Sequence, residues 1–514
     1  MNHRRAVHLT IGAALSAVLV AGCSAAPSNP DPSAPAGDRV LAFGISGEAP
    51  VLKAGTEQGN LGNTLNSLVH RGLVTYDGAG TVVPALAETF EQVAPDEYRF
   101  TLRDNLTFHD GTPITVDSVR ESMAYFADPE SGTTTAVQYG NVAEIVEGPG
   151  AEFTITLRNN DSSFLQVLAD VNTPILPESG LQAEVDNIVG AGPFSYLDRE
   201  SGVSMTLERF DDFYDADTLA LDGVKLAYYA DGAARVNALL GGDVDLIDYV
   251  PWESFDQVEA AGFTVDGEMG PGLDVQFNFE VEPWNNPEVR RAVAHSIDRD
   301  KVVSNVFSGY ASPSYGLIVQ EGSEYDTPLA TDMYSYDPEL ARKILADAGF
   351  ADGIDTTLQA TSQYAFVQDT AISVQQDLAA VGIRVELDLP DWPTMMENML
   401  TGNYELGIGT ISANVTDPSY LLRFVSPPAY SHPWGYENPE VITLLEEARA
   451  AGSDTDRLDK FERAFTILKD DAPFVVMMQR SQAYAYSDRV EGFKTIPGLI
   501  VFASALTVAD VVLS

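Results

Sequence analysis

The chain contains one cysteine, Cys23, among its 514 residues, so it cannot form a disulfide within itself. It also lacks any apolar run as long as the about 20 residues that a membrane-spanning helix requires. No segment repeats with a fixed period. These absences exclude a disulfide-stapled scaffold, a multi-span membrane protein and a repeat array. With 45% hydrophobic residues, the chain has what a soluble body needs to fold around its own core.

Sequence motifs of catalysis are absent as well. There is no Gly-Lys dipeptide and hence no phosphate-binding P-loop, no His-Glu-x-x-His zinc motif and no Gly-x-Ser-x-Gly nucleophile elbow. The histidines that remain after an N-terminal signal stand too far apart to show metal-ligand spacing: His70, His109, His295 and His432. We therefore predict no enzymatic activity, no catalytic residue, no cofactor and no metal site.

Basic residues are scarce: the chain has 29 lysines and arginines against 76 aspartates and glutamates, a net charge of −47. Loss of Arg4 and Arg5 with the signal described below leaves 27 basic residues and a charge of −49. A field of this sign repels nucleic acid and anionic lipid surfaces, so neither is expected as a partner. We interpret the charge as a general solvated acidic surface rather than as a field that selects cationic ligands.

The N-terminus has the layout of an export signal, in which two arginines precede a short apolar run and small residues lead into Cys23. The sequence Val20-Ala-Gly-Cys23 resembles the lipobox of bacterial lipoproteins, whose cysteine carries the lipid. We predict a lipoprotein signal peptide at 1–23 and a protein held outside the cytoplasm through lipidated Cys23, either on the outer face of the cell membrane or in the periplasm. The general secretory and twin-arginine export routes both stay open.

The Pro/Ala/Ser tract at 24–37 has little to bury, which predicts an extended tether. The about 490 residues that follow the signal are too many for one core, so two or three domains are expected. Alternation of apolar and polar residues predicts strands at 97–102 and 152–157.

Three helices are predicted where a capping side chain, a proline and an acid follow one another, at Asn286-Pro287-Glu288, Asp337-Pro338-Glu339 and Asn438-Pro439-Glu440. Gly349 and Gly452 are predicted as the C-terminal caps of the second and third of these helices. Helical and strand patterns are mixed throughout, which is typical of an α/β fold.

A series of motifs occurs in an order that is more specific than any one of them: Arg71-Gly-Leu-Val-Thr-Tyr-Asp77, Val83-Pro-Ala-Leu-Ala-Glu-Thr-Phe90, the stretch 98–115, Gly190-Ala-Gly-Pro-Phe194, and the stretches 283–299, 336–350 and 382–386. This series resembles the family-five substrate-binding proteins of ABC importers, the oligopeptide, dipeptide and nickel type, over essentially the whole body.

The resemblance implies an α/β, two-lobed fold like that of periplasmic binding proteins (type II, cluster C), with an extra domain inserted in the first lobe. By position in the motif series we place lobe I at 38–72, 179–275 and 488–514, the inserted domain at 73–178 and lobe II at 276–487. The implied function is the solute-binding component of an ABC importer: a small ligand between hinged lobes shifts an open/closed equilibrium that the permease reads. The expected partners are that ligand and the permease transmembrane subunits, and the protein is expected to be a monomer.

The resemblance also implies a set of ligand-binding residues. Trp392 and Met396 match a family helix that walls the pocket, where they would supply an aromatic plate and a pliable thioether. By the same match, Gln58 and Asn60 come from the first lobe, and Asn278, Tyr315 and Phe366 from the second. Ser412 and Asn414 lie in the segment that matches a pocket strand, and Asp417 and Trp434 are further candidates beside it.

An oligopeptide or dipeptide is the cargo that the family favours, but one departure counts against it. Where peptide binders commonly carry an aspartate for the ligand's ammonium group, this chain has Asn414, a loss of about 1.5 to 3 kcal/mol for such a partner. Asp417 is a candidate replacement, with capping of the helix after Pro418 as the competing role. An oligosaccharide, an opine-like amino-acid conjugate and a metal chelate stay open as ligands. Trp434 is a candidate stacking surface for a sugar or aromatic ring, with packing inside its own loop as the competing role.

Other classes of protein also stay open at this stage. A secreted hydrolase requires a nucleophile with a base or a carboxylate pair, and no such motif occurs. An adhesin would be expected to contain sequence repeats, and this sequence has none. A chemosensory receptor would use the same closing lobes to dock a receptor instead of a permease.

Overall fold

The computed structural model of the chain describes residues 39–48, 53–56, 59–133, 135–181, 188–319, 322–411, 417–426 and 431–514. The segment Arg39–Ser514 forms one compact unit. The predicted signal peptide, the anchor Cys23 and the predicted tether lie outside the described residues. Within the described part of the chain, no helix combines the length and the apolar character needed to cross a bilayer.

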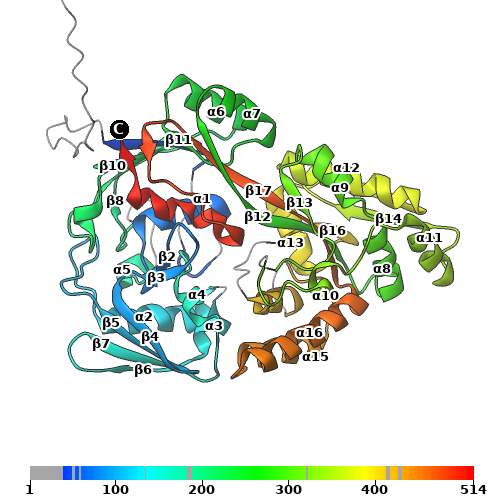
Figure 1. Cartoon of the computed structure of the whole chain (residues 1–514), viewed down its shortest axis with the longest axis horizontal. Helices are drawn as coiled ribbons and strands as arrows, with labels where there is room; N and C mark the ends of the chain where they lie inside the picture. Colours follow the sequence, from blue (N-terminus) through cyan, green and yellow to red (C-terminus); the bar gives the residue numbers. More distant parts are fainter. Residues whose placement is uncertain are drawn as a thin grey trace, which may run out of the picture. The chain divides into compact units, whose positions relative to one another are not determined.

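An 11-stranded mixed sheet runs through this unit (Figure 1). In spatial order the strands are β15 (Ile383–Asp388), β14 (Ile354–Gln359), β16 (Leu406–Ile411), β12 (Thr264–Phe277), β17 (Phe474–Tyr486), β11 (Leu246–Ile247), β1 (Val40–Ile45), β10 (Gly223–Tyr228), β9 (Ser204–Arg209) and β8 (Phe194–Glu200), with β13 (Ala311–Pro313) beside β17. The pairs β15–β14, β14–β16, β11–β1 and β1–β10 are parallel, whereas the strands in the middle and the β10–β9–β8 end are antiparallel.

Two long strands, β12 and β17, carry the sheet from one half of the unit to the other (Figure 1). Residues 264–269 of β12 pair with residues 481–486 of β17, whose end also pairs with β11. Residues 272–276 pair with residues 474–479, beside β16. The register shifts between these two stretches. Because such an irregularity bends and twists a strand pair, it marks the passage from one lobe to the other.

The remaining strands form three small sheets. The largest is antiparallel, with the spatial order β4 (Ala87–Ala94), β5 (Glu97–Leu102), β7 (Glu152–Leu157) and β6 (Val142–Glu147). The two others are the pairs β2 (Val74–Tyr76) with β3 (Val82–Pro84), and β18 (Val490–Glu491) with β19 (Val512–Leu513).

The helices that cover these sheets are mostly short. The α-helices are α1 (Gly59–Val69), α2 (Val116–Ala127), α3 (Ala136–Gly140), α4 (Phe164–Leu168), α5 (Glu178–Leu181), α6 (Gly232–Gly241), α7 (Phe255–Ala260), α8 (Pro287–Ser296), α9 (Arg299–Val306), α10 (Pro328–Thr331), α11 (Pro338–Asp347), α12 (Ala365–Ala380), α13 (Trp392–Thr401), α14 (Leu422–Val425), α15 (Pro439–Arg449) and α16 (Asp454–Asp471). The 3-10 helices are η1 (Pro129–Ser131), η2 (Ala216–Thr218), η3 (Trp252–Ser254), η4 (Pro418–Leu421) and η5 (Gly498–Asp510).

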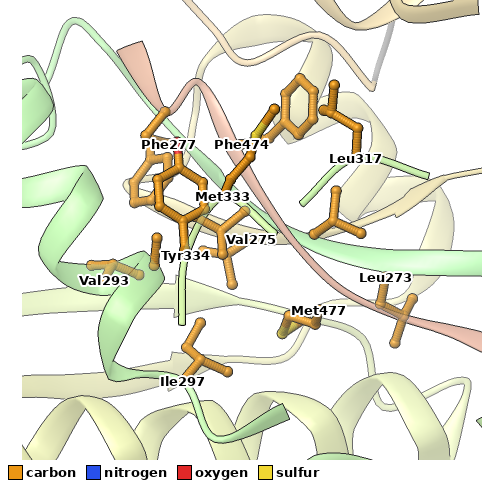
Figure 2. Packing of buried hydrophobic residues seen from close by; sticks show 14 of the residues in the cluster. Leu273, Val275, Phe277, Val293, Ile297, Leu317, Met333, Tyr334, Phe474 and Met477 are labelled. Atoms are coloured by element: carbon orange, nitrogen blue, oxygen red, sulfur yellow. The ribbon is translucent and has the colours of Figure 1, made fainter. Parts of the chain in front are cut away.

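Separate hydrophobic clusters stabilise the parts of the unit. The largest lies around β12, where Leu273, Val275 and Phe277 pack with residues of α8 and β17 (Figure 2). Another cluster contains Phe100 and Phe153, whose stacked rings join β5 to β7 at 5.4 Å between centroids. Each buried side chain of this size contributes about 1.5 to 3 kcal/mol. The predicted domain boundaries stay predictions.

Local predictions can be compared with the observed elements. The α/β class, both strands and all three helix starts are confirmed, since α8, α11 and α15 begin at the proline and are capped by the preceding side chain. Gly349 follows α11 with φ of +97°, as expected of a C-terminal cap. The prediction for Gly452 was wrong. Helix α15 ends at Arg449, and Gly452 instead precedes Ser453, the N-cap of α16.

Candidate ligand-binding site

A buried arginine lies where the two long strands pass between the lobes. Arg480 stands on β17 opposite the register shift of β12, and only 4% of its surface is exposed. Its Nη1 donates to Oε1 of Gln482 at 2.7 Å, and its Nη2 donates to the hydroxyl of Tyr249 at 2.8 Å. Both acceptors are uncharged, so the guanidinium keeps its full positive charge without a counter-charge from these partners.

Three aromatic rings face this guanidinium. Its central carbon lies 5.0 Å from the ring centre of Phe366, 5.3 Å from that of Tyr249 and 6.0 Å from that of Trp252. Trp252 is fixed in turn, because its Nε1 donates to the carbonyl of Ser481 at 2.9 Å and its ring meets Phe366 edge-on at 5.6 Å. Cation–π attraction of about 0.5 to 2 kcal/mol per ring stabilises the buried charge in part.

Contacts from α1 and α6 hold Tyr249 in place. Tyr249 has φ of +48°, a conformation that bulky residues rarely adopt. Arg235, on α6, donates to the carbonyls of Asp248 and Tyr249 at 2.9 and 2.8 Å, and its Nε lies 3.3 Å from Oδ1 of Asp248. Asn60, predicted to bind ligand, donates from α1 to the other carboxylate oxygen of Asp248 at 2.6 Å. These bonds fix the turn that presents the Tyr249 hydroxyl to Arg480.

Two residues predicted from the second lobe, Phe366 and Trp392, are linked by a third ring. The ring of Tyr364 lies 6.0 Å from that of Phe366 and 5.4 Å from that of Trp392, which it meets edge-on. Burial raises the pKa of Tyr364, and the neighbouring Tyr249 raises it further. Phe366, Tyr364 and Trp392 therefore continue from Arg480 along one aromatic line, which runs from the crossing strands to the start of α13.

Met396 and Trp434 lie at the far end of this aromatic line. Both pack with Trp392 around the buried Met395 and Met399 of α13. The Trp434 ring covers the end of that helix, where a Cβ added to Gly402 would come within 2.4 Å of the indole nitrogen. Three of the predicted residues thus pack against one cluster, Trp392, Met396 and Trp434, and Phe366 is joined to Trp392 through the ring of Tyr364.

Asn278 supports this surface from behind. It is 2% exposed and donates from Nδ2 to the carbonyls of Gly402 and Tyr404, at 2.9 and 2.8 Å. Its Oδ1 accepts the N–H of Glu280 at 3.0 Å. Its amide nitrogen therefore holds the turn between α13 and β16, its amide oxygen holds the segment after β12, and contact with a ligand stays a prediction.

Asp417 has protein partners on both carboxylate oxygens. One oxygen accepts the N–H of Ser419 at 2.8 Å and caps η4, while the other pairs with Arg457 of α16. Arg457 also donates to Ser162 at 2.9 Å. The capping role that competed with ligand binding is the one this structure displays. A ligand-binding role for Asp417 stays a prediction.

The remaining predicted residue that the structure describes, Tyr315, is not joined to the aromatic line by the contacts found among the described residues. Tyr315 donates its hydroxyl to Asp300 at 2.7 Å and lies over Arg299, and burial raises its pKa to about 12. Its role therefore stays a prediction. Gln58, Ser412 and Asn414 lie outside the described residues.

Sequence reasoning missed the residues at the centre of this site: Tyr249, Trp252, Tyr364, Arg480 and Gln482. One signal was present. Strand β17 begins with five apolar residues, Phe474-Val-Val-Met-Met478, and is then interrupted by the polar run Gln479-Arg-Ser-Gln482. A buried strand breaks its apolar pattern only where the polar side chains have partners, so such a run indicates a functional position.

In the described part of the chain, no three side chains of histidine, cysteine, aspartate or glutamate lie close enough together to hold a metal ion. Two small cavities lie away from Arg480, one beside Leu317 and Phe474 in the second-lobe core and one beside His70 and Leu506.

Comparison with known proteins supplies the family. The model of the bacterial extracellular solute-binding proteins, family 5 (middle), matches residues 81–432. The chain belongs to this family. As a family 5 protein it is the solute-binding component of an ABC importer, and both the predicted family and the predicted two-lobed fold are confirmed. Family 5 binding proteins are extracytoplasmic, and the relatives found are solute-binding proteins rather than enzymes.

Individual relatives of this family 5 protein cover nearly its whole length. The structure of the PBP AgaA from A. tumefaciens R10, in complex with agropinic acid, is 32% identical with a TM-score of 0.84, covering 92% of this chain and 99% of that chain. The glutathione-binding protein GsiB of Escherichia coli K12 is 24% identical over 96% of this chain and 97% of its own. DppA from Helicobacter pylori, in complex with the peptide STSA, shares the fold with a TM-score of 0.78 at 21% identity, covering 93% of this chain and 99% of that chain.

Proposed function

We propose that this protein captures a small opine-like amino-acid conjugate outside the cytoplasm and delivers it to the transmembrane subunits of an ABC permease. The observation that carries the proposal is the aromatic line from Arg480 to Trp392, which meets the Asn60–Asp248 contact of the first lobe at Tyr249. A ligand that touches both sides of such a junction binds the closed form more tightly than the open one. It thereby shifts the equilibrium that the permease senses.

The opine-like class rests on two observations. AgaA, whose structure holds agropinic acid, is 32% identical over 92% of this chain. In addition, the carboxylate of Asp417, the candidate anchor for a peptide ammonium group, is engaged by Arg457 and by the N–H of Ser419. A peptide ammonium group would have to share this carboxylate with both partners.

A peptide-like ligand is the second candidate. It is favoured by GsiB, a glutathione-binding protein that aligns with 96% of this chain. Oligosaccharides and metal chelates rank below it, since no contact among the described residues selects for them. The same binding event would also serve a chemosensory receptor.

We further propose that Cys23 carries the lipid anchor, that 24–37 is the tether and that the body works as a monomer without catalytic activity. The support is the sequence Val20-Ala-Gly-Cys23 and the absence of any other cysteine from the chain. Labelling cells with radioactive palmitate tests the anchor. A Cys23→Ser protein that still takes up label would contradict it.

The ligand class is tested with the body from Gly37 onward, by thermal unfolding and titration calorimetry. The panel consists of agropinic acid, glutathione, short peptides, oligosaccharides and nickel chelates. A ligand at 100 times its Kd stabilises the folded state by about 2.7 kcal/mol, which is a rise in Tm of about 3 °C for a body of this size. A saturable rise with agropinic acid supports the proposal, and binding of peptides alone contradicts it.

A further inference from the structure

The buried arginines of the described chain differ in what satisfies them. Five are no more than 5% exposed: Arg71, Arg235, Arg290, Arg299 and Arg480. The first four donate to backbone carbonyls, which is the way an arginine braces a fold. Arg480 alone among these five donates only to side chains, Gln482 and Tyr249, and neither carries a charge. Its partners therefore leave its positive charge uncompensated.

The two partners of Arg480 are themselves donors with capacity to spare. Because arginine cannot accept a hydrogen bond, the amide oxygen of Gln482 must face it, and the amide nitrogen must face away. That nitrogen belongs to a side chain that is 2% exposed, and it has no hydrogen-bond partner. The Tyr249 hydroxyl oxygen accepts from Arg480, so its hydrogen is left to donate to a further group.

Acidic side chains of the protein do not use these donors. Glu268, which stands opposite Gln482 in the ladder, forms no ion pair with Arg480, nor does any other carboxylate of the described residues. A cluster of donors around a buried positive charge, without a carboxylate of the described residues beside it, is complementary to an anion. A carboxylate fits best, since its two oxygens match the fork of a guanidinium.

The walls of this cluster indicate what accompanies the carboxylate. Phe366 and Trp252 flank Arg480, and the ring of Phe502 stacks on Tyr249 at 6.4 Å with an interplanar angle of 13°. These flat apolar surfaces suit the carbon skeleton of an organic acid rather than an inorganic anion, which would need polar contacts on all sides.

We propose that Arg480, Gln482 and the Tyr249 hydroxyl bind a carboxylate of the transported solute, whose skeleton then extends along the aromatic line toward Trp392. The inference rests on the proposed function and deepens it, because it says which group of the ligand is recognised and by which residues. In a chain with a net charge of −47, the site gives an anion one buried place where it is attracted.

The test is calorimetric titration of agropinic acid and of the same compound esterified at its carboxyl groups, against wild-type protein and three variants. Arg480→Gln should lower the affinity for the acid at least 30-fold, and Arg480→Lys about tenfold, because lysine keeps the charge but loses the fork. Gln482→Leu should cost about fivefold. Gln375→Leu is the matched control: its amide donates to Val385 at 2.9 Å, outside this site, and it should stay within twofold of wild type.

The esterified compound separates recognition from general damage. It should bind the wild type as weakly as the acid binds Arg480→Gln, and it should be indifferent to that substitution, as a double-mutant cycle requires. Equal losses for acid and ester in Arg480→Gln, or an unchanged affinity for the acid, would overturn the proposal.

Two further readouts keep the carboxylate site and the ligand class distinguishable. If glutathione or a peptide binds instead and depends on Arg480, the opine class fails while the carboxylate site stands. If only uncharged oligosaccharides bind, the carboxylate site fails while solute binding stands.

Without any ligand, Arg480→Gln should leave the Tm unchanged or higher, because it removes a buried charge without a counter-charge. A Tm lowered by 3 °C or more would show a structural role and overturn the proposal.

Discussion

Two buried arginines lie on either side of one turn, and the protein satisfies them in different ways. Arg235 has the carboxylate of Asp248 at 3.3 Å and three backbone carbonyls, whereas Arg480 has an amide and a phenol. The first is closed to other partners and fixes the turn at Tyr249. The second keeps its charge available. A buried arginine whose donors meet a carboxylate and backbone carbonyls braces the fold, whereas one that donates only to uncharged side chains has charge available for an anionic ligand.

Breaking the buried ion pair between Arg235 and Asp248 should have the largest effect on the free energy of unfolding. Asp248 is fully buried, and burial raises its pKa above the ordinary value although Arg235 opposes this. In Asp248→Ala the guanidinium of Arg235 is left buried without a counter-charge. We expect the free energy of unfolding in urea to fall by about 3 to 5 kcal/mol.

The matched control for this loss is Asp222→Ala, which breaks the exposed pair with Arg39 at 2.6 Å. An exposed pair contributes about 1 kcal/mol or less. If both variants lost the same unfolding free energy, the buried pair would contribute no more to stability than an ordinary surface pair, contrary to this prediction.

A buried acid without an ion pair in the described part of the chain, Asp274, extends the comparison to the pH dependence of stability. Asp274 is fully buried on β12 and forms no ion pair among the described residues, and burial raises its pKa to about 7 although Gln276 opposes this. Since the folded pKa lies above the unfolded value near 4, the fold favours the protonated acid. Stability from this group is therefore present in acid and lost as the pH rises from about 4 to about 7.

Asp274→Asn should remove this dependence. Between pH 5 and pH 8 the wild type should lose about 3 kcal/mol more unfolding free energy than the variant, as measured by urea titration at both values. Other titrating groups cancel in the difference. An identical wild-type-to-variant difference at the two pH values would show that Asp274 does not titrate in this range.

The smallest effect is expected at the other paired aspartate. Asp417→Asn keeps the cap of η4 but loses the ion pair with Arg457, so we expect a fall of about 1 to 2 kcal/mol in unfolding free energy. Affinity for agropinic acid, measured by calorimetry, should stay within twofold.

Asp337→Asn, at the N-cap of α11, where the carboxylate accepts the N–H of Leu340 at 2.9 Å, serves as the control and should cost less. A tenfold loss of ligand affinity confined to Asp417→Asn would restore this residue as a ligand anchor and count against the opine class.

Comparison of residues at the site shows how far motif matching reaches. Phe366 and Trp392 were selected by resemblance, and they lie on the aromatic line. Asn278 was selected in the same way, yet its side chain is occupied by the carbonyls of Gly402 and Tyr404. Matching a motif identifies which residue occupies a family position. It does not identify the hydrogen-bond partners of that side chain, because these come from neighbours outside the motif.

The helix starts and the strands could be read from residues that are close in the chain. The acidic composition and the family followed from the whole sequence, through its residue counts and the order of its motifs. Capping at Asn286 or Asn438 needs only the next few residues, so its physics is contained in the local sequence. The carboxylate site was decided by the tertiary structure alone. Tyr249, Phe366 and Arg480 meet only because β12 and β17 cross between the lobes. Whether a buried arginine is neutralised or left for a ligand depends on that long-range packing, since electrostatic pairing acts through space and not along the chain.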